Sequence, residues 1–312
     1  MNDILPSALT TAGVIGKQMN KLQQLFQPRC KHRHTAATHP KCFLNGVTVE
    51  RAVKNGHFPK ILLLDIETLP MEVRVWNLGK QRISPHNVLK DFSIVCWAAK
   101  WLYNDEVMSE AVTIDEALNR EDSSILQGMW DLLDQADMAV AHNGNGFDFG
   151  KLNARFIINN YNPPMYYRTL DTLQVARKHF KFSSNQLDYI NKILGLRRKE
   201  SSSGLWDRIL DGDASAIGEM QTYNMGDIFA LEDAYLRLRP WIQNHPNLGV
   251  MMDTQDAKCP KCLEQITEDE WTSDYYTTNT GRYRGFRCAA CGAVGRSGIN
   301  EITKNQAKEL AR

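Results

Sequence analysis

The stretch "ILLLDIETLP" at residues 61–70 constrains this chain most, because two carboxylates interrupt an apolar run. The run before Asp65 predicts a buried strand, and alternation along a strand places Asp65 and Glu67 on one face. Burying an isolated charge is costly unless the charge is paired or bound to a metal. Two carboxylates on one face also repel each other unless a cation lies between them. The stretch therefore predicts a metal site on a buried strand.

The length and composition are those of a globular protein. With 312 residues, of which 43% are hydrophobic, the chain can form one large domain with smaller attachments. No apolar run approaches the length of a membrane span, and the first residues include the acid Asp3 where a secretory signal needs basic residues. We expect a soluble, cytoplasmic protein without a membrane partner.

The residue patterns predict an α/β fold, a mixed sheet flanked by helices. β-branched and aromatic residues predict strands at 61–66, 73–78, 93–102 and 107–113, and a short buried strand after 137. Helical spacing predicts a helix at 123–136, with Ser123 or Ser124 as its N-cap. Further helices are predicted at 147–160, 170–180, 184–195, 205–212 and 214–242.

Three regions are predicted along the chain: a basic segment at 1–58, a main domain at 59–245 and a small module at 250–312. Residues 29–60 contain seven Lys or Arg, one acid and four of the eight His. Such a basic patch suits a polyanionic partner, and a solvated basic linker is the alternative.

Two more carboxylates occur in special settings. Asp148 follows a short strand and a Gly-rich turn in "AHNGNGFDFG", at the start of a predicted helix. Asp227 lies in "YNMGDIFALEDAY", with Tyr223 one helical turn before it on the same face. Any one of these acids alone could be a helix cap or a surface charge. All four together indicate one site.

These motifs resemble those of the DEDD superfamily of 3′→5′ exonucleases, which have a ribonuclease-H-like fold. The three motifs are DxE with Asp65 and Glu67, N-x(3-4)-F-D with Asn143 and Asp148, and Y-x3-D with Tyr223 and Asp227. The last is the tyrosine (DEDDy) variant. The chain is similar, over residues 59–243, to proofreading exonucleases related to those of family B DNA polymerases.

The resemblance implies hydrolysis of phosphodiesters with two Mg²⁺ or Mn²⁺ ions, for which oxygen ligands are suited. By resemblance, Asp65 bridges both ions, Glu67 and Asp227 complete the ion that activates water, and Asp148 holds the second. Tyr223 would orient the attacking water, because a phenol with an ordinary pKa of about 10 is a poor base by itself.

The same resemblance implies substrate contacts near these motifs. Thr68 and Leu69 would touch the 3′-terminal nucleotide, and Asn143 would contact the substrate backbone. His142 is interpreted as structural, because the tyrosine variant uses no histidine base at this position.

Four cysteines near the C-terminus form two CxxC pairs, Cys259 with Cys262 and Cys288 with Cys291, separated by 25 residues. Two such knuckles predict a zinc ribbon, and so small a module would need the metal in order to fold. Reduced, unliganded thiols are the alternative. Cys96, inside an apolar run, is expected to be a core thiol.

The segment "RYRGFR" before the second knuckle interleaves Arg282 and Arg284 with aromatic residues. This pattern suits phosphate contact and base stacking. The alternatives are a structural ribbon strand and a surface that binds protein.

The N-terminal segment "CKHRHTAATHPKC" offers a second set of zinc ligands. The predicted quartet is Cys30, His34, His39 and Cys42, with His32 competing for one position. The alternative is a basic loop with incidental histidines.

These features together predict a 3′→5′ exonuclease that acts on the single-stranded 3′ end of DNA, with its zinc modules helping to bind nucleic acid. A role in replication, proofreading for a separate DNA polymerase, is one expectation. The alternatives are the same chemistry on RNA and a non-catalytic zinc-containing adaptor. The intact acids argue against the adaptor.

Overall fold

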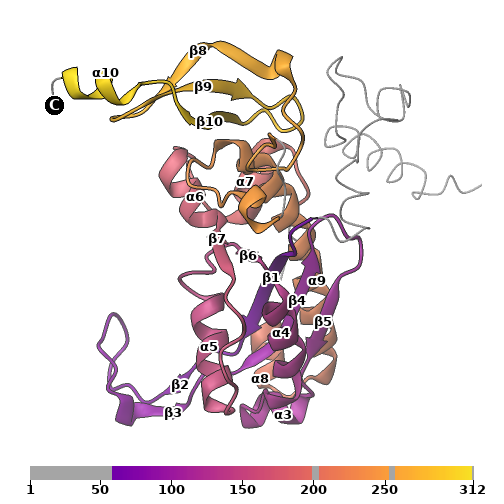
Figure 1. Cartoon of the computed structure of the whole chain (residues 1–312). Coiled ribbons are helices and arrows are strands. Elements are labelled where there is room, and N and C mark those ends of the chain that lie inside the picture. Colours follow the sequence, from indigo (N-terminus) through magenta and orange to yellow (C-terminus); the bar gives the residue numbers. More distant parts are fainter. Residues whose placement is uncertain (1–57, 199–203, 253–256, 311–312) are drawn as a thin grey trace, which may run out of the picture. The chain divides into compact units, whose positions relative to one another are not determined.

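The computed structural model describes residues 58–198, 204–252 and 257–310 (Figure 1). The chain divides into two compact units, one within Gly56–Thr254 and one within Gln255–Arg312. Each unit has its own sheet and its own buried core, and each is described separately below.

The larger unit is built on a five-stranded mixed sheet in the order β5-β4-β1-β6-β7. The central strand β1 (Ile61–Thr68) pairs antiparallel with β4 (Ile94–Trp101) and parallel with β6 (Met138–Ala141). The outer strands are β5 (Met108–Ala111), antiparallel to β4, and β7 (Arg168–Asp171), parallel to β6. Because β1 is central, its first four side chains are buried, as the apolar run predicts.

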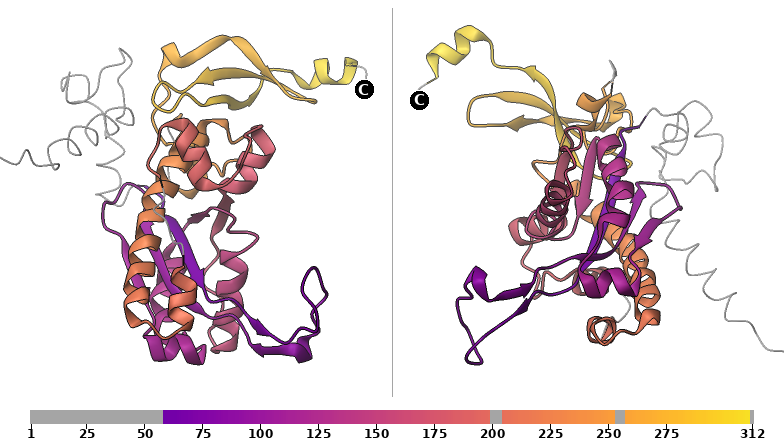
Figure 2. Two further views of the ribbon diagram at one scale, coloured as in Figure 1. Left: turned by 180° about the vertical axis from the view of Figure 1, so that it is seen from behind. Right: turned by 90° about the horizontal axis from the view of Figure 1, so that it is seen from below.

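Helices cover both faces of this sheet. Helices α4 and α5 lie in front of it in Figure 1, and α9 lies in front of it in the reverse view of Figure 2. The helices of the unit are α3 (Ile114–Asn119), α4 (Ser123–Gln135), α5 (Asp148–Ile158), α6 (Thr172–His179), α7 (Leu187–Leu194), α8 (Leu205–Leu210) and α9 (Ala214–Leu238). Short 3-10 helices occur at η2 (Pro85–Asn87), η3 (Arg239–Trp241) and η4 (Leu248–Met251).

The main core lies between the sheet and its helices. Leu62 and Leu64 of β1 belong to the same buried cluster as Leu126, Met129 and Leu133 of α4. Each fully buried side chain of this kind stabilises the fold by about 1.5–3 kcal/mol. The core therefore holds β1, which carries Asp65 and Glu67, as a rigid element.

A two-stranded ribbon separate from the main sheet follows β1. It consists of β2 (Glu72–Val73) and β3 (Val88–Lys90), which pair antiparallel. The strand predicted at 73–78 is therefore wrong beyond Val73, because residues 74–78 have no strand partner and are exposed.

Two further predictions are corrected by tertiary contacts. The N-cap of α4 is Asp122, whereas Ser123 and Ser124 lie inside the helix. The buried Asp122 carboxylate accepts the Ile94 N–H at 2.9 Å and pairs with Arg155 at 2.7 Å, so it joins β4 to α5. The beginning of the helix predicted at 170–180 is the end of strand β7.

The smaller unit contains a three-stranded antiparallel sheet in the order β10-β9-β8. Its elements are η5 (Glu268–Glu270), β8 (Trp271–Thr277), β9 (Arg282–Arg287), β10 (Val294–Asn300) and α10 (Lys304–Glu309). Its small core consists of three of the four cysteines with Ile266, Phe286 and Ala293. So few apolar side chains make the cysteines a large share of what holds the unit together.

Several predictions lie outside the described residues. They are the predicted ligands Cys30, His32, His34, His39 and Cys42, and the basic segment up to residue 57. Within the described ranges, none of the helices has the length and apolar character needed to cross a bilayer.

Candidate active site

Asp65 and Glu67 lie near the end of the central strand, on one face of it. Both are partly exposed, whereas Leu64 and Ile66 on either side are buried. In the register with β4, Asp65 lies opposite Ala98 and Glu67 opposite Cys96, and the register then shifts between Glu67 and Thr68. Such irregularities re-aim side chains at the end of a strand. The core therefore presents two carboxylates at a sheet end that side chains from helices can reach.

Helix α9 brings the third carboxylate to this strand. Asp227 is 1% exposed, and it forms a group with Asp65 and Glu67 in which one carboxylate oxygen of each residue lies within 4.8 Å of those of the others. Tyr223 lies one turn earlier on α9 and packs against the main core. The spacing of the Y-x3-D motif therefore places phenol and carboxylate on one side of the helix.

The fourth carboxylate, Asp148, is the first residue of α5 and is 2% exposed. Its Oδ1 accepts a hydrogen bond from the Ile66 backbone N–H at 3.1 Å. Asp148 is therefore fixed to the backbone between Asp65 and Glu67. All four predicted acids thus meet at one end of β1.

The loop that leads to Asp148 is held by Asp171, a residue that the sequence analysis did not single out. The buried Asp171 carboxylate accepts backbone N–H bonds from Asn143 at 3.0 Å and Asn145 at 3.2 Å, and it also caps α6. Asn143 adopts a left-handed φ of 74°, which asparagine tolerates. At Gly144 an added Cβ would lie 2.6 Å from the Ala141 Cβ, so this turn requires glycine.

The electrostatics of the group favour a bound cation. Burial first, and then the charge of Asp65, raises the pKa of Asp148 well above its usual range, against the opposing hydrogen bond from Ile66. Burial, with the charges of Glu67 and Asp65, likewise raises the pKa of the Cys96 thiol. Cys96 is therefore a neutral core thiol. A divalent cation between the carboxylates would remove the repulsion that these shifts express.

The donor set fits such a cation. All ligand atoms on offer are carboxylate oxygens, which suit Mg²⁺ or Mn²⁺ better than softer metals. Their mutual distances, within 4.8 Å, are short enough for one ion to contact several of them.

The remaining predicted residues differ in how they can reach a ligand. Thr68 is partly exposed, and its carbonyl accepts the Trp206 Nε1–H at 3.2 Å. Asn143 is exposed. Leu69, in contrast, is 0% exposed within the main core, so its side chain offers no surface to a substrate. We therefore retain Thr68 and Asn143 as proposed contacts and omit Leu69.

His142 has both ring nitrogens in hydrogen bonds within the protein. Nδ1 lies 2.9 Å from the Thr172 hydroxyl, and Nε2 lies 3.0 Å from the Asn185 carbonyl oxygen. Since a carbonyl can only accept, the hydrogen lies on Nε2. This arrangement is what the structural interpretation of His142 predicts.

Asn224 is a further residue of the site that no motif in the sequence marks. Its side chain is fully buried on α9, and its Nδ2 donates to Asp65 Oδ2 at 2.6 Å. The only signal in the sequence is its position between Tyr223 and Asp227, three residues before the acid. Without a structure, that position does not distinguish Asn224 from an ordinary core residue.

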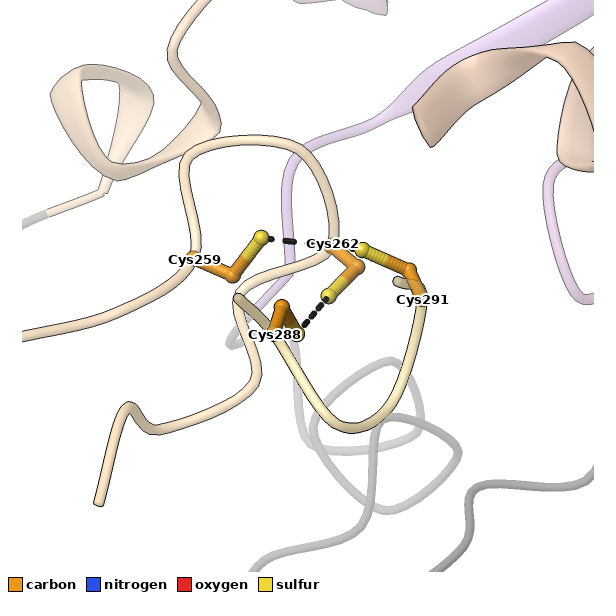
Figure 3. A group of neighbouring side chains, drawn as sticks. All are labelled: Cys259, Cys262, Cys288 and Cys291. Carbon is orange, nitrogen blue, oxygen red and sulfur yellow. Dashed lines mark hydrogen bonds between the residues drawn. The ribbon is translucent and has the colours of Figure 1, made fainter. Parts of the chain in front are cut away.

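In the smaller unit, the four cysteines converge (Figure 3). The sulfur atoms of Cys259 and Cys291 are 3.7 Å apart, and those of Cys262 and Cys288 are 3.6 Å apart. Tetrahedral zinc with Zn–S bonds of about 2.3 Å requires sulfur separations of about 3.8 Å. The four thiols therefore fit a zinc ion, and this cluster could form the predicted ribbon.

The two knuckles share one backbone pattern. Cys259 N–H donates to the Glu264 carbonyl at 2.7 Å, and Cys288 N–H donates to the Ala293 carbonyl at 2.9 Å. In each knuckle the residue after the second cysteine has a left-handed φ, 62° at Leu263 and 78° at Gly292. The repeated geometry explains why both CxxC pairs present their sulfurs inward.

The predicted arginines lie on the central strand of the ribbon, β9. The Arg282 guanidinium lies 4.4 Å from the Tyr275 ring centroid, and that of Arg284 lies 4.9 Å from the Trp271 ring centroid. Arg284 also forms an ion pair with Glu268. Both arginines are thus engaged within the unit.

The larger unit is similar to proteins of known families. Residues 93–239 match a family model, RNase_H_2, described as the RNase_H superfamily. Among matching solved structures is the family B DNA polymerase from the hyperthermophilic archaeon Pyrobaculum calidifontis, with 16% identity and a TM-score of 0.45. The match covers 59% of this chain and 25% of that polymerase chain, so this chain corresponds to a quarter of its length. The comparison with curated proteins found no match.

The family match includes Asp148, Tyr223 and Asp227 and begins after Asp65 and Glu67. Ribonuclease-H-like nucleases use divalent metals, so the match agrees with the oxygen ligands that the acidic cluster offers. Together with the mixed sheet and its flanking helices, this similarity indicates that the larger unit has a ribonuclease-H-like fold.

Proposed function

We propose that this protein is a metal-dependent 3′→5′ exonuclease that hydrolyses DNA from single-stranded 3′ ends. One observation carries the proposal: the carboxylates of Asp65, Glu67 and Asp227 converge within 4.8 Å at one end of the sheet. Asp148 lies buried beside them. The order and spacing of the three motifs support the tyrosine variant of the DEDD exonucleases.

Two divalent cations bound at this site would supply a hydroxide nucleophile and stabilise the charge on the leaving oxygen. Asp65, Glu67 and Asp227 would hold the ion that activates water, and Asp65 and Asp148 would hold the second ion. The rigid placement of these acids on β1, α5 and α9 would spare the reorganisation that flexible ligands need.

The other residues of the site have orienting roles in this proposal. Tyr223, one turn from Asp227, would orient the attacking water by its hydroxyl group. Asn224 would hold Asp65 in one rotamer through its 2.6 Å hydrogen bond. Thr68 and Asn143 would contact the 3′-terminal nucleotide and the substrate backbone. Arg282 and Arg284 would add phosphate contacts from the zinc ribbon.

RNA is the competing substrate, because the carboxylates act on the phosphate that both polymers share. A separate DNA polymerase is the partner we propose if the activity serves proofreading. The non-catalytic adaptor is disfavoured, because all four acids are intact and meet at one end of β1.

The test is cleavage of matched single-stranded DNA and RNA, each labelled at the 5′ end in one reaction and at the 3′ end in another. A 3′→5′ exonuclease gives a ladder of shortening 5′-labelled products and releases the 3′ label as a mononucleotide. Release of the 5′ label as a mononucleotide would show that hydrolysis runs in the 5′→3′ direction instead. If RNA is shortened faster than DNA, RNA and not DNA is the preferred substrate.

A further inference from the structure

The segment at 74–86, which we call the arm, is exposed at every residue. It connects β2 to β3 and extends away from the main sheet (Figure 2). Within the arm, Trp76 is 93% exposed and Leu78 is 99% exposed. A tryptophan and a leucine left in water forgo the free energy that burial would provide. Their exposure therefore indicates a surface that a ligand covers.

The base of the arm is fixed to the domain. Glu72 pairs with Lys90 at 3.4 Å across the ribbon and with Arg120 at 2.9 Å beyond α3. The Arg74 N–H donates to the Asn87 carbonyl at 2.8 Å. The arm therefore leaves the domain in a defined direction.

This base adjoins the acidic site. Only three residues lie between Thr68, where strand β1 ends, and the start of β2. On the returning side, the Lys151 ammonium lies 3.7 Å from the ring centroid of Phe92 and 4.8 Å from that of Phe147, the residue before Asp148. Both ends of the arm are thus attached to segments that carry the proposed metal ligands.

The charge of the arm is uniformly positive. Residues 74–86 contain Arg74, Lys80 and Arg82 and no Asp or Glu. Cations combined with an exposed indole are suited to a nucleic-acid strand, because the cations contact phosphates and the indole stacks on any base. The seven residues from Val73 to Gly79 span at most about 20 Å when extended. This length reaches beyond a single nucleotide.

We propose that the arm is a second nucleic-acid contact, which holds the strand whose end lies at the acidic cluster. Trp76 stacks on a base, Leu78 packs beside it, and Arg74, Lys80 and Arg82 pair with phosphates. This proposal rests on the proposed function, because the arm would contact the same substrate strand beyond the nucleotide that is cleaved.

The test measures the affinity for a fluorescein-labelled single-stranded oligo(dT) that is long enough to reach the arm. It compares the protein that has an unmodified arm with arm variants. All variants are made in the full chain carrying Asp65→Asn, so that hydrolysis does not consume the ligand. Trp76→Ala with Leu78→Ala is expected to weaken binding about tenfold, and Trp76→Phe to retain it, since phenylalanine also stacks. Trp241→Ala is the matched control, because Trp241 is 65% exposed but lies on η3.

Charge and turnover give independent readouts. Replacing Arg74, Lys80 and Arg82 by glutamine is expected to reduce the slope of log K against log salt by about 2. In the otherwise wild-type chain, the arm variants are expected to cleave a dinucleotide, too short to reach the arm, at the unchanged rate. At a limiting concentration of the long strand, the cleavage rate of these variants is expected to fall in proportion to their loss of affinity for it.

The outcomes separate the two proposals. Reduced binding in a protein that cleaves nothing would support the arm and reject the exonuclease. Oligo(dT) affinity and salt slope that are the same in every arm variant would overturn the arm. So would a dimer in solution that Trp76→Ala dissociates without loss of oligo(dT) affinity, because the arm would then contact a second copy of the chain.

Discussion

Asn224 Nδ2 donates a 2.6 Å hydrogen bond to Asp65 Oδ2 and thereby joins α9 to β1 within the proposed active site. Asn224 is fully buried, so its side chain has no freedom to swing away into water. The bond fixes the orientation of the Asp65 carboxylate relative to Asp227 on the same helix. Asn224 is thus a positioning residue for the carboxylates, and it contacts no substrate in our proposal.

Asn224→Ala is expected to lower the hydrolysis rate by about 10- to 100-fold, the usual effect of losing a partner that orients a metal ligand. Raising the Mg²⁺ or Mn²⁺ concentration should recover part of this loss. Thr222→Ala is the control, because Thr222 lies on the exposed side of the same helix. Unchanged activity and metal dependence in Asn224→Ala would show that Asp65 needs no such support.

The zinc content of the full chain distinguishes the two cysteine sites. The ribbon cysteines and the N-terminal Cys/His quartet together predict two zinc ions per chain. Cys288→Ser should remove one and destabilise the smaller unit, whose core it helps to form. Cys42→Ser should remove the other. Elemental analysis that finds one zinc in the wild type, lost with Cys288→Ser, would eliminate the N-terminal site.

Substitutions at the equivalent positions Leu263 and Gly292 of the two knuckles are expected to change the stability of the ribbon in opposite directions. A left-handed backbone costs an L-residue about 1–2 kcal/mol but costs glycine little. Leu263→Gly should therefore stabilise the ribbon, and Gly292→Ala should destabilise it by about 1 kcal/mol, with no clash because its Cβ would meet nothing within 4 Å. Thermal unfolding and chelator titration check both. Equal shifts in the same direction would contradict the backbone argument.

The stability of α9 is expected to depend on acid pH through its N-cap, Asp213. Hydrogen bonds from Ser215 and then Arg208 lower the pKa of Asp213 from 3.8 to about 2. Because this pKa is lower in the folded state, the ionised group stabilises the fold above the ordinary pKa. The stabilisation is lost as the pH falls through the folded value.

Asp213→Asn keeps a capping side chain but removes the titrating charge. The melting temperature of the wild type should therefore exceed that of the variant at neutral pH, and the difference should shrink as the pH falls from about 4 to about 2. A difference that stays constant over this range would show that Asp213 does not titrate with the fold.

The sequence was most informative where local pattern and burial agree. The run before Asp65 is apolar at every position, as suits a strand covered on both faces, so β1 was predictable together with its two acids. Asp148 and Asp227 were predictable because each lies in a motif of fixed spacing. Glycine and asparagine before Asp148 already indicated the turn that Asp171 holds.

Residues whose role depends on distant partners could not be predicted in the same way. Asn224 and Asp171 act on segments far away in the chain, and no local pattern marks them. Strand β7 has four residues and exists because β6 lies beside it. The aromatic and β-branched pattern around Trp76 predicted a strand, yet no partner strand covers it, and the segment is an exposed arm.

The central claim is that the four carboxylates form a metal-dependent hydrolytic site. The most direct measurement is cleavage of 5′-labelled single-stranded DNA by the zinc-replete wild type, Asp65→Asn and Asp227→Asn, with Mg²⁺, with Mn²⁺ and with EDTA. Thermal unfolding of the same samples establishes that each variant is folded. We predict a ladder for the wild type with either metal, no ladder with EDTA, and none for either folded variant. Turnover by Asp65→Asn or Asp227→Asn at the wild-type rate, or wild-type cleavage that persists in EDTA, would contradict the account.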